Sequence, residues 1–155
     1  MKNNIDFEIF KLLPIFIPKV LVATICGAII GYERELKSKV AGIRTNILIC
    51  VGCTLYTAIS FYISSMTPNS DPTRIIAQIV TGIGFIGAGV IMKNEDKIVG
   101  VTTASFIWVV SSIGVLAGIG SIITPIIITI GLVFVSKIFE RVEKKIKNKR
   151  NALRD

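Results

Sequence analysis

The chain contains no charged residue between Ile98 and Ser136, a stretch of 39 residues. A helix needs about 20 mostly apolar residues to cross the hydrocarbon core of a bilayer, so this stretch predicts two crossings. Gly118, Gly120 and Ser121 mark the turn between them. The sequence therefore predicts an integral membrane protein built from α-helices.

Three further stretches have the length of one crossing. Residues 46–66 and 75–92 are apolar and bounded by charge. In residues 12–32, Pro14 and Pro18 argue against a straight helix. We expect a broken or interfacial start there, then a helix from about Pro18 with Lys19 snorkelling to the membrane surface. The predicted all-α transmembrane domain (residues 1–136) has about five spans, at 12–32, 46–66, 75–92, 98–117 and 120–136, and a basic helical tail covers 137–155.

The composition agrees with a membrane protein and excludes several other classes. Apolar residues make up 52% of the chain and charged residues 18%, with a mean hydropathy of +0.71; soluble domains carry about 25% charge. Disorder, a disulfide scaffold and a coiled coil are excluded on the same grounds. The chain has no His, which excludes a Ser-His-Asp triad, a Cys-His pair and a His-liganded metal site.

Basic residues indicate how the five spans are oriented. Fourteen of the 18 Lys and Arg residues lie in the segment after the first span, the 93–97 loop and the tail. The positive-inside rule places all three segments in the cytoplasm and the N-terminus outside. A four-span topology would leave one basic cluster on the wrong side. The formal charge of +8 is interpreted as attraction to anionic lipid headgroups, not to nucleic acid, because it lies beside a span without interleaved aromatics.

The glycines are interpreted as helix-packing residues. Residues 82–87 match G-x-G-x-x-G, but they lie inside an uncharged run of helical length and lack the strand that a dinucleotide site requires. A flexible or ligand-lined segment is the alternative. Small residues let neighbouring membrane helices approach closely. Cys26, Cys50 and Cys53 are likewise expected to be small packing residues. The predicted packing glycines are Gly27, Gly31, Gly82, Gly84, Gly87, Gly89, Gly114 and Gly118.

Two polar clusters are candidates for a functional site. In the five-span topology the first lies on the cytoplasmic side, where Glu33 is expected to pair with Arg44, and Asn46 with the threonines of the fourth span. The alternative is that these residues are interface charges and helix caps. The cluster has too few carboxylates for a divalent-cation site. Its members are Glu33, Arg34, Arg44, Thr45, Asn46, Thr102 and Thr103.

The second polar locus opens the third span. Asp71 followed by Pro72 is typical of a helix start, and this structural role is the alternative to a functional one. Gln78, inside the apolar run, carries an amide that needs hydrogen-bonding partners. The locus consists of Asp71, Arg74 and Gln78.

Three sequence blocks resemble the MgtC/SapB family of membrane proteins. They are Gly-Tyr-Glu-Arg-Glu at 31–35 with Ala-Gly-Ile-Arg-Thr-Asn at 41–46, the glycine-rich block from Asp71 to Ile91, and Val-Gly-Val-Thr-Thr-Ala-Ser at 99–105 followed by Trp108. Val99 departs from the family pattern, in which a basic residue is expected. Larger members continue into a soluble C-terminal domain, so the sequence is interpreted as a short form.

The resemblance implies a bacterial inner-membrane (plasma-membrane) protein linked to growth under magnesium limitation and, in pathogens, to virulence through survival inside macrophages. Family members are thought to act on other membrane proteins, including the proton-translocating ATP synthase, and thereby on the membrane potential. They are generally not regarded as magnesium transporters.

We therefore expect a non-enzymatic membrane regulator without a cofactor. Its expected partners are the lipid bilayer and other membrane proteins, and homo-oligomerisation is left open. The alternative is a transporter or channel for an ion or small solute. That alternative requires a polar residue in every layer, whereas Ile83, Phe85 and Ile86 interrupt the third span.

Overall fold

The computed structural model describes residues 2–94 and 97–152 and is all-α apart from one short hairpin. Four helices, or parts of them, are long and apolar enough to cross a membrane, and the fifth, α3, is a shorter apolar helix. The chain is thus a multi-pass membrane protein, as predicted. In the described residues the elements are α1 (Lys2–Leu36), α2 (Ile43–Met66), α3 (Thr73–Gly89), β1 (Met92–Asn94), β2 (Lys97–Val99), α4 (Val101–Ile119) and α5 (Ile123–Asn151).

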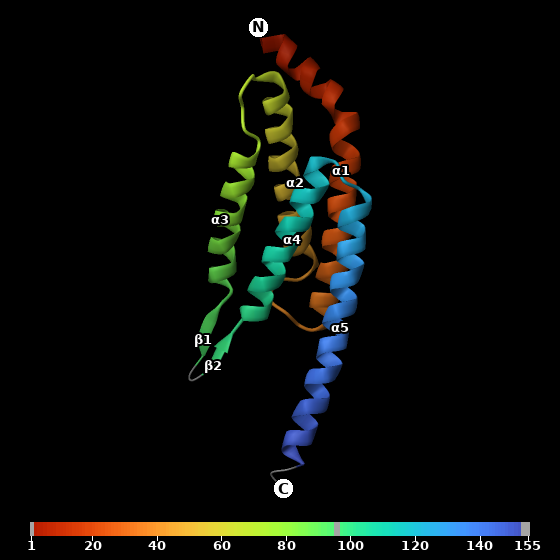
Figure 1. Cartoon of the computed structure of the whole chain (residues 1–155), viewed down its shortest axis with the longest axis vertical. Coiled ribbons are helices and arrows are strands. Elements are labelled where there is room, and N and C mark those ends of the chain that lie inside the picture. Colours follow the sequence, from red (N-terminus) through yellow and green to blue (C-terminus); the bar gives the residue numbers. More distant parts are fainter. Residues whose placement is uncertain (1, 95–96, 153–155) are drawn as a thin grey trace.

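The helices run up and down beside one another (Figure 1). Helices α1, α2 and α4 form the centre, with α5 against α1 and α4, and α3 against α4 and α2. One end of the bundle holds the end of α1, the starts of α2 and α4, and the hairpin; we call it the basic end. Helix α5 continues well beyond it (Figure 1), so the predicted tail is helical as far as Asn151.

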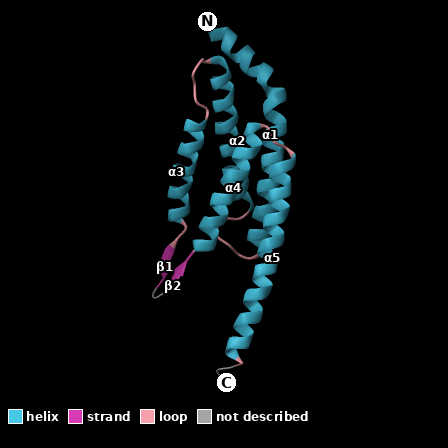
Figure 2. Cartoon of the chain, in the orientation of Figure 1, coloured by secondary structure: helices cyan, strands magenta, loops and turns pink. Residues whose placement is uncertain are grey.

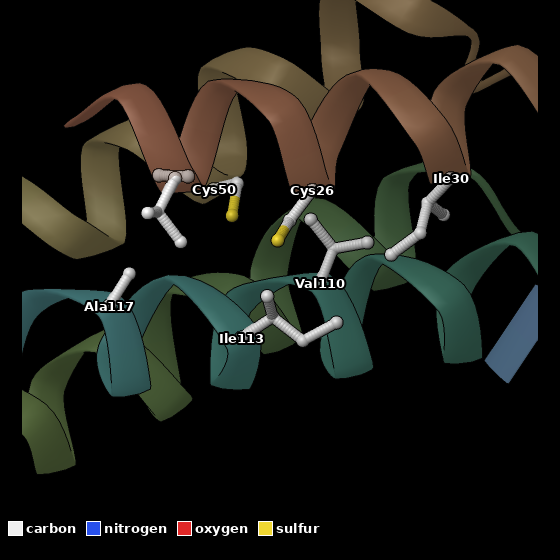
Figure 3. Packing of buried hydrophobic residues seen from close by; sticks show 8 residues of the cluster. Cys26, Ile30, Cys50, Val110, Ile113 and Ala117 are labelled. Carbon is white, nitrogen blue, oxygen red and sulfur yellow. The ribbon is translucent and has the colours of Figure 1, made fainter. Parts of the chain in front are cut away.

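Small and branched apolar side chains fill the contact between α1, α2 and α4 (Figure 3). Cys26 and Ile30 of α1 lie against Cys50 of α2 and against Val110 and Ile113 of α4. All three cysteines are buried, unpaired thiols, in agreement with their predicted packing role.

Glycines set the distance between these helices. A Cβ atom built on Gly27 of α1 would lie 2.8 Å from the carbonyl oxygen of Asn46 in α2. A Cβ on Gly118 of α4 would lie 2.7 Å from the carbonyl oxygen of Thr54. Gly31 and Gly114 meet α2 or its N-terminal flank equally closely. Because backbone atoms cannot turn aside as side chains do, only glycine permits this separation.

The predicted break in the first span is wrong. Helix α1 is continuous through Pro14 and Pro18, although its N-terminal part is tilted relative to the rest (Figure 1). Proline removes a backbone hydrogen bond and can kink a helix without ending it. The Nζ of Lys19 donates to the carbonyl oxygen of Gly118 at 2.8 Å. It thereby satisfies a carbonyl of the last turn of α4, which has no partner within its own helix.

The third and fourth spans are shorter than predicted because a hairpin separates them. Helix α3 ends at Gly89, and Met92–Asn94 pairs antiparallel with Lys97–Val99 (Figure 2). Gly100 then adopts a left-handed conformation, with φ of 91°, and a side chain there would collide with the Val90 carbonyl group. This turn directs the chain from the hairpin into α4.

Candidate functional site

An adjacent acid and base near the end of α1 form the centre of the polar cluster. Glu33 and Arg34 are only 5% and 3% exposed. Both Nε and Nη2 of Arg34 donate to the Glu33 carboxylate, the latter at 2.6 Å. The Arg34 guanidinium also lies 3.7 Å from the centre of the Phe106 ring of α4, a cation–π contact. Burial is tolerated because each charge has a partner of opposite sign.

Ser136 of α5 completes this pair. Its hydroxyl accepts from Nη2 of Arg34 at 2.7 Å and donates to Glu33 Oε1 at 3.0 Å. The residue is the last of the uncharged stretch of α5. One hydroxyl therefore joins α1 to α5 at the depth where the apolar part of α5 ends.

Two lysines and a glutamate extend the network beyond the bundle. Lys37 Nζ lies 2.5 Å from Glu33 Oε1 and 2.5 Å from Glu140 Oε2, and Lys144 Nζ lies 2.8 Å from Glu140 Oε1. Burial works against the Lys37 charge, but hydrogen bonds to Glu140 and Glu33 outweigh it and raise its pKa. Lys144 and then Lys37 lower the pKa of Glu140 to about 2. We call Glu33, Arg34, Lys37, Ser136 and Glu140 the charged network.

The predicted pairing of Glu33 with Arg44 is wrong. Arg44 is exposed and forms no ion pair within the described part of the chain. Glu33 instead faces α5, where it accepts from Ser136. Arg34 and Lys37, its neighbours on α1, pair with its carboxylate. The carboxylate that meets the start of α2 belongs to Glu35, whose Oε2 accepts from the Ile43 backbone N–H at 2.8 Å. An acidic group at a helix N-terminus is favoured by the helix dipole.

Asn46 does not bond to the threonines of α4, contrary to prediction. The side chain is fully buried, and its Nδ2 donates to the carbonyl oxygens of Ala41 and Gly42 at 2.9 and 2.8 Å. It thereby fixes the turn that leads into α2. Its Oδ1 has no hydrogen-bond partner in the described residues, which costs about 1–3 kcal/mol. Thr103 is buried nearby in α4, whereas Thr102 is exposed and Thr45 is half-buried.

The second locus does not form a bonded cluster. Asp71 Oδ1 accepts from the backbone N–H of Thr73 at 2.8 Å and from its hydroxyl at 2.6 Å. These bonds, the hydroxyl first, lower the Asp71 pKa. Asp71 therefore bonds the first residue of α3 from the position before the N-cap, which is Pro72 and not Asp71 as predicted. Arg74 and Gln78 are exposed, and neither is hydrogen-bonded through its side chain to another described residue.

The predicted packing glycines of α3 have different surroundings from those of α1 and α4. A Cβ on Gly82, Gly84 or Gly89 would meet nothing within 4 Å, and one on Gly87 would make only an ordinary contact with Ala104. An apolar groove of about 750 Å³ separates α3 from α2. It is lined by Leu48, Ile49, Gly52, Cys53, Tyr56, Ile75, Gln78, Ile79, Gly82, Ile83, Phe85 and Ile86.

Comparison with known proteins places this arrangement in a family. The model of the MgtC family matches residues 20–145. The chain belongs to the MgtC family. No solved structure matches it.

Curated relatives of this MgtC-family chain are longer than it is. The putative magnesium transporter YhiD of Escherichia coli K12 is 41% identical over 135 residues, which are 84% of this chain and 62% of YhiD. Protein MgtC of Salmonella typhimurium LT2 is 46% identical over 106 residues, 68% and 44% of the two chains. Protein MgtC of Brucella abortus is 40% identical over 114 residues, 74% and 47%. The chain spans about half the length of the curated relatives it matches.

Lys37, Ser136 and Glu140 were not among the predicted site residues of this MgtC-family member. Lys37 lies four positions after Glu33, a spacing at which helical charges meet, so this part was detectable. The contribution of α5 was not, because no sequence pattern says which helix packs against α1. Among the described residues, no group of three or more His, Cys, Asp or Glu side chains is placed to hold a metal ion.

Proposed function

We propose that the chain is a non-enzymatic regulator of the bacterial inner membrane that supports adaptation to low magnesium by binding other membrane proteins through α3. In pathogens this role extends to intracellular survival. Its effect is on partners such as the ATP synthase, and through them on the membrane potential. The observation that carries the proposal is the open space beside Gly82, Gly84 and Gly89 of α3, with Gly82 lining the apolar groove.

Three properties of α3 support a transmembrane helix as the occupant. Gly82, Gly84 and Gly89 leave open space beside the backbone, which permits the close helix approach that stabilises association in lipid. Phe85, on the same helix, is 84% exposed and offers an apolar anchor. Gln78 lines the groove, where its amide can hydrogen-bond a partner helix in surroundings without competing water.

The charged network supports the same proposal from the other side of the bundle. It ties α1 and α5 together and places Arg34 against α4. Helix α3 contacts α4 and, less extensively, α2. The groove on the α2 side of α3 leaves room beside that helix for a partner.

The test uses Gly82→Leu, which fills the groove, in a strain whose low-magnesium growth depends on this protein. Gly131→Leu on α5 is the matched control, because Gly131 also has nothing within 4 Å but lies away from the groove. We expect Gly82→Leu to abolish low-magnesium growth, and photo-crosslinking from α3 to other membrane proteins, at an unchanged protein level. Full complementation by Gly82→Leu, or equal failure of the control, would contradict the proposal.

The alternative, a transporter, is favoured by a different observation. The buried face of α2 carries Asn46, Thr54, Thr57 and Ser60, a polar line along the centre of the bundle, and the E. coli relative is named a putative magnesium transporter. However, Thr54 already donates to backbone carbonyl oxygens of Cys50 and Gly114, as satisfied hydroxyls within helix contacts do. Substrate-dependent flux into vesicles reconstituted with the full chain would reverse this ranking.

A further inference from the structure

A second cavity, of about 660 Å³, lies at the basic end, on the side of the bundle away from the α3 groove. The end of α1, the start of α4 and the middle of α5 enclose it. Its apolar wall includes Phe106, Leu132 and Val135, together with Leu36 and Phe139. The cavity begins in the uncharged part of α5 and continues past Ser136 to charged residues. It therefore spans the level at which hydrocarbon gives way to headgroups.

The charged side chains that line the cavity fall into two groups. Arg34, Lys37 and Glu140 are paired within the charged network, Arg34 with Glu33 and Lys37 with Glu140. Lys39, from the α1–α2 loop, and Glu143, from α5, also line the cavity. Both are exposed, and neither forms an ion pair with the other or with any other residue of the described chain. The cavity thus presents one uncommitted cation and one uncommitted anion above an apolar wall.

This combination selects for a ligand with three parts: an anionic group for Lys39, a cationic hydrogen-bond donor for Glu143, and an apolar body for the wall. We propose that the cavity binds a phospholipid with a primary ammonium headgroup, phosphatidylethanolamine. Its phosphate pairs with Lys39, its ammonium with Glu143, and the upper part of its acyl chains covers Phe106, Leu132 and Val135. Hydrogen bonds between ionised groups are about twice as strong as neutral ones.

Other phospholipids lack part of this match. Phosphatidylcholine has the phosphate, but its quaternary ammonium has no N–H to donate to Glu143. Phosphatidylglycerol has the phosphate and hydroxyls that can donate to Glu143, but it has no cation to pair with the Glu143 charge. The cavity therefore distinguishes phosphatidylethanolamine from both. The bound lipid connects the α1–α2 loop to α5 and closes the charged network from the outside.

The test measures lipid binding to the purified full chain in detergent by native mass spectrometry, with phosphatidylethanolamine, phosphatidylcholine and phosphatidylglycerol of identical acyl chains. We expect the wild-type chain to bind phosphatidylethanolamine about tenfold more tightly than phosphatidylcholine, as one charge-assisted hydrogen bond provides. Glu143→Gln should remove this preference and leave phosphatidylcholine binding unchanged. Lys39→Gln should weaken both lipids, whereas Lys145→Gln, which removes a tail charge two residues from Glu143 and so on the opposite side of α5, should weaken neither.

Three results would overturn the proposal. The first is equal affinity of the wild-type chain for phosphatidylethanolamine and phosphatidylcholine. The second is a preference that survives in Glu143→Gln. The third is tightest binding of phosphatidylglycerol with equal losses in Lys39→Gln and Lys145→Gln, which would indicate diffuse attraction to the basic tail. Circular dichroism of each variant checks the fold, and the outcome is independent of whether α3 binds a partner.

Discussion

The close contact between α2 and α4 allows a quantitative test at Gly118. In Gly118→Ala the new methyl carbon would lie 2.7 Å from the Thr54 carbonyl oxygen and 2.6 Å from Thr57 Cβ. An ordinary contact begins at 3.4 Å, so the two helices must separate by about 0.7 Å, the difference between 3.4 and 2.7. A gap of that size forfeits about a quarter to a half of the attraction between the atoms that it separates.

The expected cost follows from two opposing effects. Overpacking of a close contact typically costs about 1–3 kcal/mol. Replacing glycine by alanine within a helix returns about 0.5–1 kcal/mol. We therefore expect Gly118→Ala to lower the free energy of unfolding by about 1–2 kcal/mol. The carbonyl of residue 118 that accepts from Lys19 remains in the variant, so the loss reports on packing alone.

The full chain is unfolded in mixed micelles by raising the fraction of sodium dodecyl sulfate. Far-ultraviolet circular dichroism monitors the loss of helix. Gly131→Ala is the control, because a Cβ at Gly131 meets nothing within 4 Å; this variant should be neutral or slightly stabilised. If Gly118→Ala is as stable as the wild type, or if the two variants lose stability equally, the argument from helix separation is refuted.

Three further predictions concern the basic end and the topology. Ser136→Ala removes the hydroxyl that joins α1 to α5 and leaves the buried Glu33–Arg34 pair short of one hydrogen-bonding partner. The same assay should show a free energy of unfolding lower by about 1–3 kcal/mol. Ser112→Ala, at an exposed position of α4, should lower it by less. The pKa of Glu140 is about 2 in the folded chain against an ordinary value of 4.5, so its contribution to stability is present above pH 4.5 and is lost as the pH falls from there through 2. As the pH falls across that range, the unfolding midpoint should decrease less in Glu140→Gln than in the wild type. An equal dependence of the midpoint on pH in the two chains would contradict this role of Glu140. If the basic end is cytoplasmic, a membrane-impermeant thiol reagent added to intact cells should label Asn69→Cys but not Ser38→Cys, two exposed turn residues with positive φ at opposite ends of the bundle; the reverse pattern would invert the topology.

The predictions that succeeded depend on patterns within one segment. Hydrophobic length alone located the helices, since lipid contact imposes the same apolar requirement on every crossing. The pairs Gly27 with Gly31 and Gly114 with Gly118 were found from their spacing, and all four lie against backbone or close side-chain atoms of a neighbouring helix. The helix start near Asp71 was found in the same way, because its bond forms with Thr73, two residues away.

The predictions that failed depend on how segments meet. Glu33 was paired with Arg44 because both lie near the same membrane surface, yet depth does not determine the direction in which a helix faces. Asn46 was paired with threonines of α4, but carbonyl oxygens of its own turn are nearer. The glycines of α3 were predicted to pack as those of α4 do, yet a Cβ on Gly82, Gly84 or Gly89 would meet nothing within 4 Å, and one on Gly87 would make only an ordinary contact with Ala104.

The sequence by itself determined that the chain is a membrane-embedded helical bundle with a concentration of basic charge at one end, because hydrophobic length and charge distribution are properties of single segments. Only the tertiary structure decided that α5 supplies Ser136 and Glu140 to the charged network and that Gly82, Gly84 and Gly89 of α3 have open space beside them in the described part of the chain. Those outcomes depend on the rotation of each helix about its own axis. Rotation is fixed by steric fit between helices, and no single segment contains that information.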